Sequence, residues 1–186
     1  MPSIAKRGFT LLEVLIALLI FSLGLMGLAG LLTTSVKTNH SAYLRTQAIF
    51  LAQSMADRMR ANPLGLWHAK YNLGTIQTTA GTAPAAATNT PSGSMQDCTG
   101  SSCPYTNVAT RDLQVFQNQL VQFLPNAGVA INCTAPASIP AAAQLLTLPP
   151  YAQTCEIQVS WTQLPITGQS TTQTATPDVF DWVFEP

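Results

Sequence analysis

The stretch that decides the fold of this chain is Lys6-Arg7-Gly8-Phe9-Thr10-Leu11-Leu12-Glu13. Two cations and a glycine precede an apolar run that extends from Phe9 to Leu32, and Glu13 is the only charged residue in that run. An ionised carboxylate inside a membrane costs roughly 2.5–3.5 kcal/mol on insertion scales, so such a group normally has a partner. The nearest available partner is an amine, which cleavage of the chain between Gly8 and Phe9 would create.

Two simpler interpretations of this stretch are a secretory signal peptide and a plain membrane anchor. A secretory signal has an apolar segment of about 7–15 residues followed by a small-x-small cleavage site. The run here is longer, and Leu28-Ala29-Gly30 is a poor version of that site. A plain anchor needs about 20 apolar residues, which the run supplies. Neither interpretation explains a glutamate so near the start of the run.

The stretch closely resembles the type III signal of type IV pilins and type II secretion pseudopilins. The elements that carry the resemblance are Gly8, Phe9, Thr10, Leu11 and Glu13. In that family a dedicated peptidase cuts after the glycine and methylates the new N-terminal phenylalanine. The resemblance therefore implies cleavage after Gly8 and N-methylation of Phe9. It also implies that Glu13 pairs with the N-terminus of a neighbouring subunit during filament assembly.

The composition leaves room for one modest globular domain after the membrane segment. The chain has 186 residues and a net charge of zero, and 9% of its residues are charged, against a usual figure near 25%. A nucleic-acid-binding surface groups its Lys and Arg residues, whereas the few cations here are scattered, so no nucleic-acid partner is expected. Lys6 and Arg7 place the N-terminal end in the cytoplasm by the positive-inside rule. The chain after the apolar run is therefore expected on the periplasmic or extracellular side.

The cysteines all fall on that oxidising side, which favours disulfides. Four cysteines allow three pairings, and the sequence alone does not choose among them. The spacing favours Cys98–Cys103, which closes a short loop, and Cys133–Cys155, which joins two strand-like segments whose apolar residues alternate. A metal site would use tight C-x-x-C pairs or histidine partners, and neither occurs in the sequence, so no metal is expected.

One long helix is predicted from about Phe9 to about Ala61. The segment from Thr33 to Asn62 contains neither proline nor glycine, and Asn62-Pro63 ends the pattern because the residue before a proline is disfavoured in the α region. One face of the second half is predicted to be buried, since apolar residues recur there at helical spacing. They are Leu44, Ala48, Leu51, Ala52, Met55 and Met59.

Shorter elements are predicted after the long helix. An amphipathic pattern indicates a second helix from about Asn107 to Leu124, and a Thr- and Ala-rich stretch from Thr75 to Ser94 is interpreted as a surface loop. Alternating residues indicate strands at 129–133, 155–162 and 178–185. The predicted fold is α+β: a long N-terminal helix packs on a small antiparallel sheet with a second short helix, as in the type IV pilin fold that the resemblance implies.

The predicted domain organisation has four parts. Residues 1–8 form a cleaved prepilin leader, and residues 9–32 form a transmembrane helix that becomes the filament core. Residues 33–62 are the periplasmic half of the long helix, and residues 63–186 are a globular head domain with disulfides. The expected location is the bacterial inner membrane, as a single-pass prepilin with a periplasmic head, and then the extracellular pilus.

A second, looser resemblance covers roughly Ala109 to Thr162. A helix with Asp-Leu and Phe that ends in Leu-Pro, then a glycine and a short strand, then a Cys-Glu-Ile-x-Val-x-Trp strand, is similar to the PilV-type minor pilins. It implies a minor pilin that primes or supports type IV pilus assembly at the tip and affects adhesion and twitching motility. The implied partners are other minor pilins, the major pilin, a large tip adhesin, the prepilin peptidase and the inner-membrane assembly platform. The alternative is a minor pseudopilin of the type II secretion tip complex.

The sequence gives little support for a catalytic role. His40 and His68 are the only histidines, and no Ser-His-Asp or Cys-His grouping can be argued. No catalytic residue and no cofactor are therefore expected, and the chain is not predicted to be an enzyme. Asp178, Asp181 and Glu185 point to different faces of a strand, whereas Ca²⁺ needs 6–8 converging oxygens. These three carboxylates are interpreted as solvated surface charge.

Overall fold

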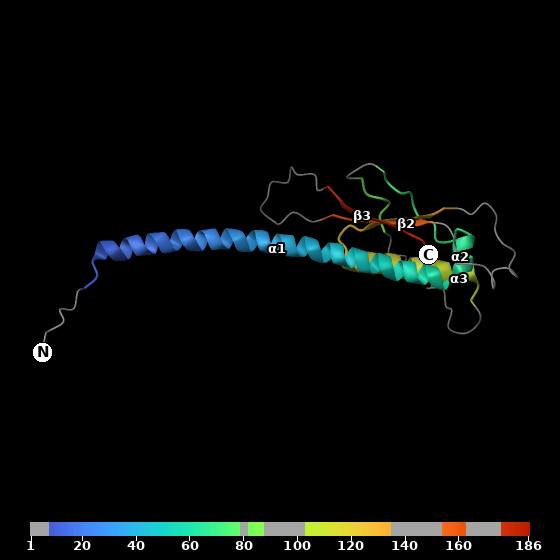
Figure 1. The fold of residues 1–186 in the computed structure, drawn as a ribbon, viewed down its shortest axis with the longest axis horizontal. Helices are drawn as coiled ribbons and strands as arrows, with labels where there is room; N and C mark the ends of the chain where they lie inside the picture. The colour runs from blue at the N-terminus through green and yellow to red at the C-terminus, as the bar shows by residue number, and fades with distance from the viewer. Residues whose placement is uncertain (1–7, 79–81, 88–102, 135–153, 163–175) are drawn as a thin grey trace. The chain divides into compact units, whose positions relative to one another are not determined.

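The computed structural model describes residues 8–78, 82–87, 103–134, 154–162 and 176–186. The element order is α1 (Leu11–Ala61), α2 (Pro63–Trp67), α3 (Tyr105–Phe123), β1 (Gly128–Cys133), β2 (Cys155–Trp161) and β3 (Asp178–Phe184) (Figure 1). The chain divides into two compact units, residues 1–42 and 43–186. The first contains the beginning of α1, and the second contains the end of α1 with all the other elements.

Helix α1 ends at Ala61 as predicted, but it begins at Leu11 rather than at Phe9. Thr10 accounts for the later start, because its carbonyl and its hydroxyl both accept from the backbone N–H of Glu13, at 3.1 and 3.3 Å. A threonine that caps a helix in this way lies outside its first turn. The predicted buried face is confirmed, and it also includes Ala56. Its members are Leu44, Ala48, Leu51, Ala52, Met55, Ala56 and Met59.

Helix α2 was not predicted, and it follows α1 after a single residue. Asn62 caps it: the side-chain oxygen accepts from the backbone N–H of Gly65 at 3.2 Å, and Pro63 occupies the first turn. Gly65 is required at its position because a Cβ there would lie 2.5 Å from the Asn62 side-chain nitrogen and 2.9 Å from the Tyr71 ring. A short turn of helix therefore packs tightly against the end of α1.

Helix α3 begins two residues earlier than predicted and ends one residue earlier, at Phe123. Leu124 has an extended backbone and precedes Pro125, which agrees with the expected stop. The buried positions are Ala109, Asp112, Phe116 and Leu120. Three of these are apolar and lie on one face of the helix, and Asp112 brings a carboxylate onto the same face.

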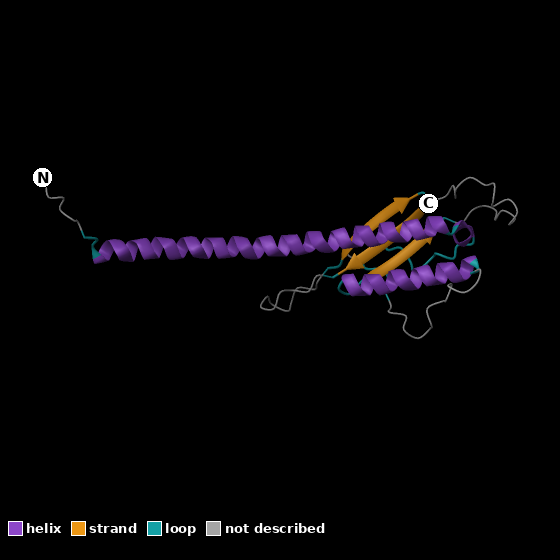
Figure 2. Ribbon diagram, turned by 90° about the horizontal axis from the view of Figure 1, so that it is seen from below, coloured by secondary structure: helices purple, strands orange, loops and turns teal. Residues whose placement is uncertain are grey.

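The three strands form one antiparallel sheet in the order β1-β2-β3. In its register Val129 faces Val159, Ile131 faces Ile157 and Cys133 faces Cys155, so the predicted alternation of both strands is confirmed. These residues pack with the end of α1 and with α3 in one buried cluster, and the two helices lie along one face of the sheet (Figure 2). Burying one such apolar side chain stabilises the fold by about 1.5–3 kcal/mol.

Part of the predicted surface loop lies on the opposite face of the sheet. The Gln77 backbone donates to the Gln158 side-chain oxygen at 2.8 Å, and its carbonyl accepts from the Gln158 side-chain nitrogen at 2.9 Å. Pro84 is buried, and the neighbouring Ala86 forms a bridge to Gly128. Gln158 is buried and bonded to Gln77 on this face, whereas strand alternation alone would leave it facing water.

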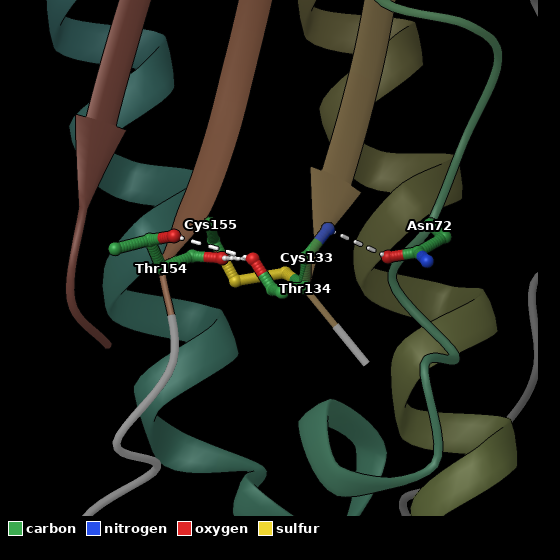
Figure 3. Close-up of a disulfide and its surroundings, with 5 residues drawn as sticks. All are labelled: Asn72, Cys133, Thr134, Thr154 and Cys155. Carbon is green, nitrogen blue, oxygen red and sulfur yellow. Dashed lines mark hydrogen bonds between the residues drawn. A yellow bond between two sulfur atoms is a disulfide. The ribbon is translucent and has the colours of Figure 1, made fainter. Parts of the chain in front are cut away.

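A disulfide joins Cys133 to Cys155 across β1 and β2, as the spacing predicted (Figure 3). The two residues are direct partners in the sheet, with their Cα atoms 4.0 Å apart. One residue further on, the Thr134 backbone and hydroxyl both donate to the Thr154 carbonyl, at 3.0 and 3.1 Å. Cys103 is also disulfide-bonded, but the predicted Cys98–Cys103 pair lies outside the described residues because Cys98 does.

Replacing Cys133 and Cys155 together by serine should lower the free energy of unfolding by about 3 kcal/mol, the loop-closure value for a sequence separation of 22. Denaturant titration of the full-length protein in detergent measures it. Thr134→Val is the matched control, since it removes a hydrogen-bonding hydroxyl at the same end of the sheet and should cost no more than about 1.5 kcal/mol. A loss of stability in the double variant no larger than in the control would contradict the assigned role of the disulfide.

Candidate assembly site

The predicted processing and assembly residues lie together at the N-terminal end of the described chain. Gly8 and Thr10 are exposed, Phe9 is 83% exposed, and Glu13 lies exposed in the first turn of α1. The spacing Thr10-x-x-Glu13 is that of a capping box, a sequence signal for the start of a helix at Leu11 rather than at Phe9. The Thr10 hydroxyl accepts a hydrogen bond from the Glu13 N–H at 3.3 Å, as the first residue of a capping box does.

Electrostatics at this end favour a carboxylate. The N-terminus of a helix carries a partial positive charge, so an acidic residue in the first turn is stabilising there and a cation is not. An amine on Phe9 would add a full positive charge at the same end. A carboxylate near that amine would offset both charges, and Glu13 is the acidic residue in this turn.

The surface of α1 behind Glu13 is apolar all round. Large apolar side chains from Leu11 to Leu32 are about half to four-fifths exposed in the isolated chain. Among the described residues, α1 is the one helix long and apolar enough to cross a membrane, with a mean hydropathy of 2.6 in its most apolar window. A helix that is apolar on every side is buried by lipid or by other helices.

The hydroxyl groups in and just after this span satisfy themselves within the helix. Ser22 donates to the Leu19 carbonyl at 2.8 Å, and Thr33 donates to the Ala29 carbonyl at 2.7 Å. Bonds of this kind let Ser and Thr occupy a helix without needing water. The ionised Glu13 carboxylate differs from these hydroxyls, because it has no proton to donate to a carbonyl of its own helix. Glu13 is therefore the residue of this span for which a cationic partner is expected.

A long apolar N-terminal helix, a short helix and a small antiparallel sheet make an arrangement that is consistent with the type IV pilin fold. Comparison with protein families agrees. Residues 4–29 match the prokaryotic N-terminal methylation motif, and residues 30–114 match the family of the type IV pilin Tt1218. The two consecutive matches make residues 4–114 similar to type IV pilins, and each match covers less than half of the chain. Searches of the curated proteins and of the solved structures found no match.

A type IV pilin assembles with other pilins and is processed by the prepilin peptidase. The N-terminal motif and the apolar helix fit anchoring in the membrane followed by incorporation into a pilus. The matches do not single out the PilV type.

The other residues considered from the sequence are dispersed in the structure. His40 is exposed on α1, and the ring of His68 stacks on Tyr105 with centroids 4.8 Å apart. Asp181 accepts a hydrogen bond from the side chain of Gln158 at 2.8 Å. Within the described ranges no group of three or more His, Cys, Asp or Glu side chains is placed to hold a metal ion.

A buried polar network that the sequence did not reveal joins the end of α1 to α3. The Tyr71 hydroxyl donates to Asp112 Oδ2 at 2.8 Å and accepts from Asn62 Nδ2 at 3.1 Å. Arg58 Nη1 lies 3.5 Å from Asp112 Oδ1. Tyr71 is fully buried, and Asn62 and Asp112 are nearly so. The network fixes the end of α1 against the head, because each buried polar group needs the others to satisfy it.

Because of this network, the free energy of unfolding should depend on pH in the alkaline range. Burial, and then the hydrogen bond to Asp112, raise the pKa of Tyr71 above its usual value near 10. The folded state therefore holds the phenolic proton more tightly than the unfolded state. Its contribution to stability is complete below about pH 10 and decreases as the pH rises further.

Tyr71→Phe should lower the free energy of unfolding at pH 8 by about 1–3 kcal/mol, since it leaves the buried Asp112 carboxylate without that donor. It should also remove part of the loss of stability above pH 10, where one such group contributes up to about 1.4 kcal/mol per pH unit. Denaturant titrations of both proteins from pH 8 to 11 measure the two effects. Tyr43→Phe is the control, because Tyr43 is 54% exposed and should change neither. Equal pH dependence in Tyr71→Phe and the parent protein would contradict the account.

Proposed function

We propose that this chain is a minor pilin of the PilV type, made as a membrane-anchored prepilin and incorporated at or near the tip of a type IV pilus. In this proposal the peptidase cuts after Gly8 and methylates Phe9. Residues 1–8 are then the leader, 9–32 the membrane and filament-core helix, 33–62 the periplasmic half of that helix, and 63–186 the head. The observation that carries the proposal is Glu13, an isolated carboxylate at the start of a helix that is otherwise apolar on every side.

The mechanism has two stages. The apolar part of α1 is first stored in lipid, where protonation or snorkelling limits the burden of Glu13 to a few kcal/mol. Neighbouring pilin helices then replace the lipid in the filament, and the carboxylate gains the cationic N-terminus of another subunit as a partner. Hydrogen bonds between ionised groups are about twice as strong as neutral ones. The contact therefore favours addition of a subunit in one register.

The tip position and the partners are proposed from the similarity of residues 109–162 to PilV-type minor pilins. The proposed partners are other minor pilins, the major pilin, a large tip adhesin and the inner-membrane assembly platform. The disulfide-linked sheet supports this role, since Cys133–Cys155 holds β1 to β2 in a head that has to persist outside the cell. Through the adhesin, the subunit would affect adhesion and twitching motility.

Glu13→Leu should insert into the membrane and be processed normally, and the head should keep its stability, because Glu13 lies far along the chain from the core that begins at Leu44. Recovery of partner pilins from membranes should nevertheless fall at least tenfold, together with the number of surface pili. Pull-down through an epitope tag on the head, electron microscopy of piliation and gold labelling of the tag at pilus ends are the measurements.

Ser22→Leu is the matched control, because it adds the same apolar side chain to the same helix and retains the carboxylate. It should leave partners and pili at parent levels. Normal partner recovery and piliation with Glu13→Leu would refute the assembly contact. A loss of protein secretion with normal piliation would refute the pilus assignment and favour the type II secretion pseudopilin.

A further inference from the structure

The two outer edges of the sheet differ in how their backbone groups are satisfied. On β1, the N–H groups of Val129 and Ile131 donate outward to the carbonyls of Ala85 and Leu73, at 2.9 and 2.7 Å. The Cys133 N–H donates outward to the Asn72 side-chain oxygen at 2.9 Å. Residues from the segments before α3 therefore satisfy all three outward N–H groups of this edge. Within the described ranges, no strand pairs with the outer edge of β3.

The register identifies the groups that β3 presents at its open edge. The odd-numbered residues of β1 bond outward, so its even-numbered residues bond to β2, since hydrogen-bonding directions alternate along an antiparallel strand. The odd-numbered residues of β2 then bond to the even-numbered residues of β3, including Ile157 to Trp182. The outward N–H and C=O groups of β3 are consequently those of Val179, Asp181 and Val183.

The side chains of the same three residues lie on the sheet face away from the helices. Phe180 and Trp182 pack against the core cluster on the other face, and side chains alternate along a strand. Val183 is 60% exposed, Asp181 is exposed and Val179 is partly exposed. Residues 176–186 also carry Asp178, Asp181 and Glu185 with no basic residue among them. In the part of the chain that the structure describes, the edge thus combines three unpaired bonding positions with an apolar-acidic-apolar row.

We propose that the open edge of β3 binds an extended segment of a partner protein by strand addition. The segment would present an apolar side chain, a lysine or arginine and a second apolar side chain on one face, opposite Val183, Asp181 and Val179. In this mode the backbone hydrogen bonds give affinity and alternate side chains give specificity. The inference concerns the head alone and does not depend on the tip position.

A second copy of this chain fits the edge less well than such a partner. The antiparallel register that pairs the whole of β3 with its copy, Asp178 to Phe184, places Asp181 opposite Asp181. Like charges directly opposite each other are destabilising. The acidic edge therefore disfavours pairing between copies and favours a basic partner strand, and long unpaired edges without such charge are otherwise prone to pair with each other.

A peptide of the proposed pattern tests this directly on the full-length mature protein in detergent micelles. The probe is acetyl-Thr-Val-Thr-Lys-Thr-Val-Thr-amide, and its control has glutamate in place of lysine. The lysine peptide should slow hydrogen exchange at the amides of Val179, Asp181 and Val183 and should bind at least tenfold more tightly than the glutamate peptide. Val183→Pro should weaken binding at least tenfold without lowering thermal stability, because the lost N–H points outward and proline is tolerated at strand edges.

Asp181→Asn keeps an acceptor for Gln158 and removes the charge, so it should bring the two peptides to nearly equal affinity while leaving the fold intact. If Val183→Pro fails to fold, this variant still decides the question. Equal binding of both peptides to the parent protein, or an unchanged preference for lysine in Asp181→Asn, would overturn the proposal. Sedimentation that shows a dimer abolished by Val183→Pro would overturn it in favour of a second copy.

Discussion

The apolar surface of α1 between Leu11 and Leu32 needs burial, and the described part of this chain provides none of it: every one of these residues is exposed in the isolated molecule. Water is the least favourable surrounding for such a helix. Lipid and a bundle of similar helices are the two that suit it. A subunit built in this way is stable in the membrane before assembly and in a filament afterwards. In the proposed mechanism Glu13 distinguishes the two states, because only the filament offers a cationic N-terminus from another chain.

The same helix is built differently from Leu44 onward, where one face is buried and the other is polar. Leu51 and Met55 pack with Phe116 of α3 and Ile157 of β2 in one core. Asn62, Tyr71 and Asp112 then secure the end of the helix with buried hydrogen bonds.

Periodicity in the sequence was enough to predict α1, α3, the three strands, the buried face of α1 and the Cys133–Cys155 disulfide. These features depend on residues close in the chain, or on two strands whose apolar residues alternate in step. The Tyr71–Asp112 bond, the clamp between Gln77 and Gln158 and the covered edge of β1 were not predicted, because each joins segments far apart in the sequence. Gln158 shows the reason well: its place on β2 indicates exposure, and only the crossing segment near Gln77 buries it.

Helix α2 was missed for a related reason, since Pro63 and Gly65 usually indicate a loop. The capping side chain of Asn62 and the space left by Gly65 turn these residues into a turn of helix. For the N-terminal motif the sequence is more informative than the structure. Its residues can be identified from the sequence alone, while their proposed function lies in a processing step and in contacts with other chains. The structure of one subunit shows where Gly8, Phe9 and Glu13 lie. Their proposed roles concern cleavage, methylation of the new amine and a contact between that amine and a carboxylate.

The central claim is that this chain becomes an assembly subunit when a charged, methylated N-terminus is made at Phe9. Intact-mass analysis with N-terminal fragmentation, applied to the protein purified from sheared pili, tests it most directly. The account predicts a chain that lacks residues 1–8, begins at Phe9 and carries one methyl group on its amine. A chain that retains the leader, or that begins at any other residue, would contradict it.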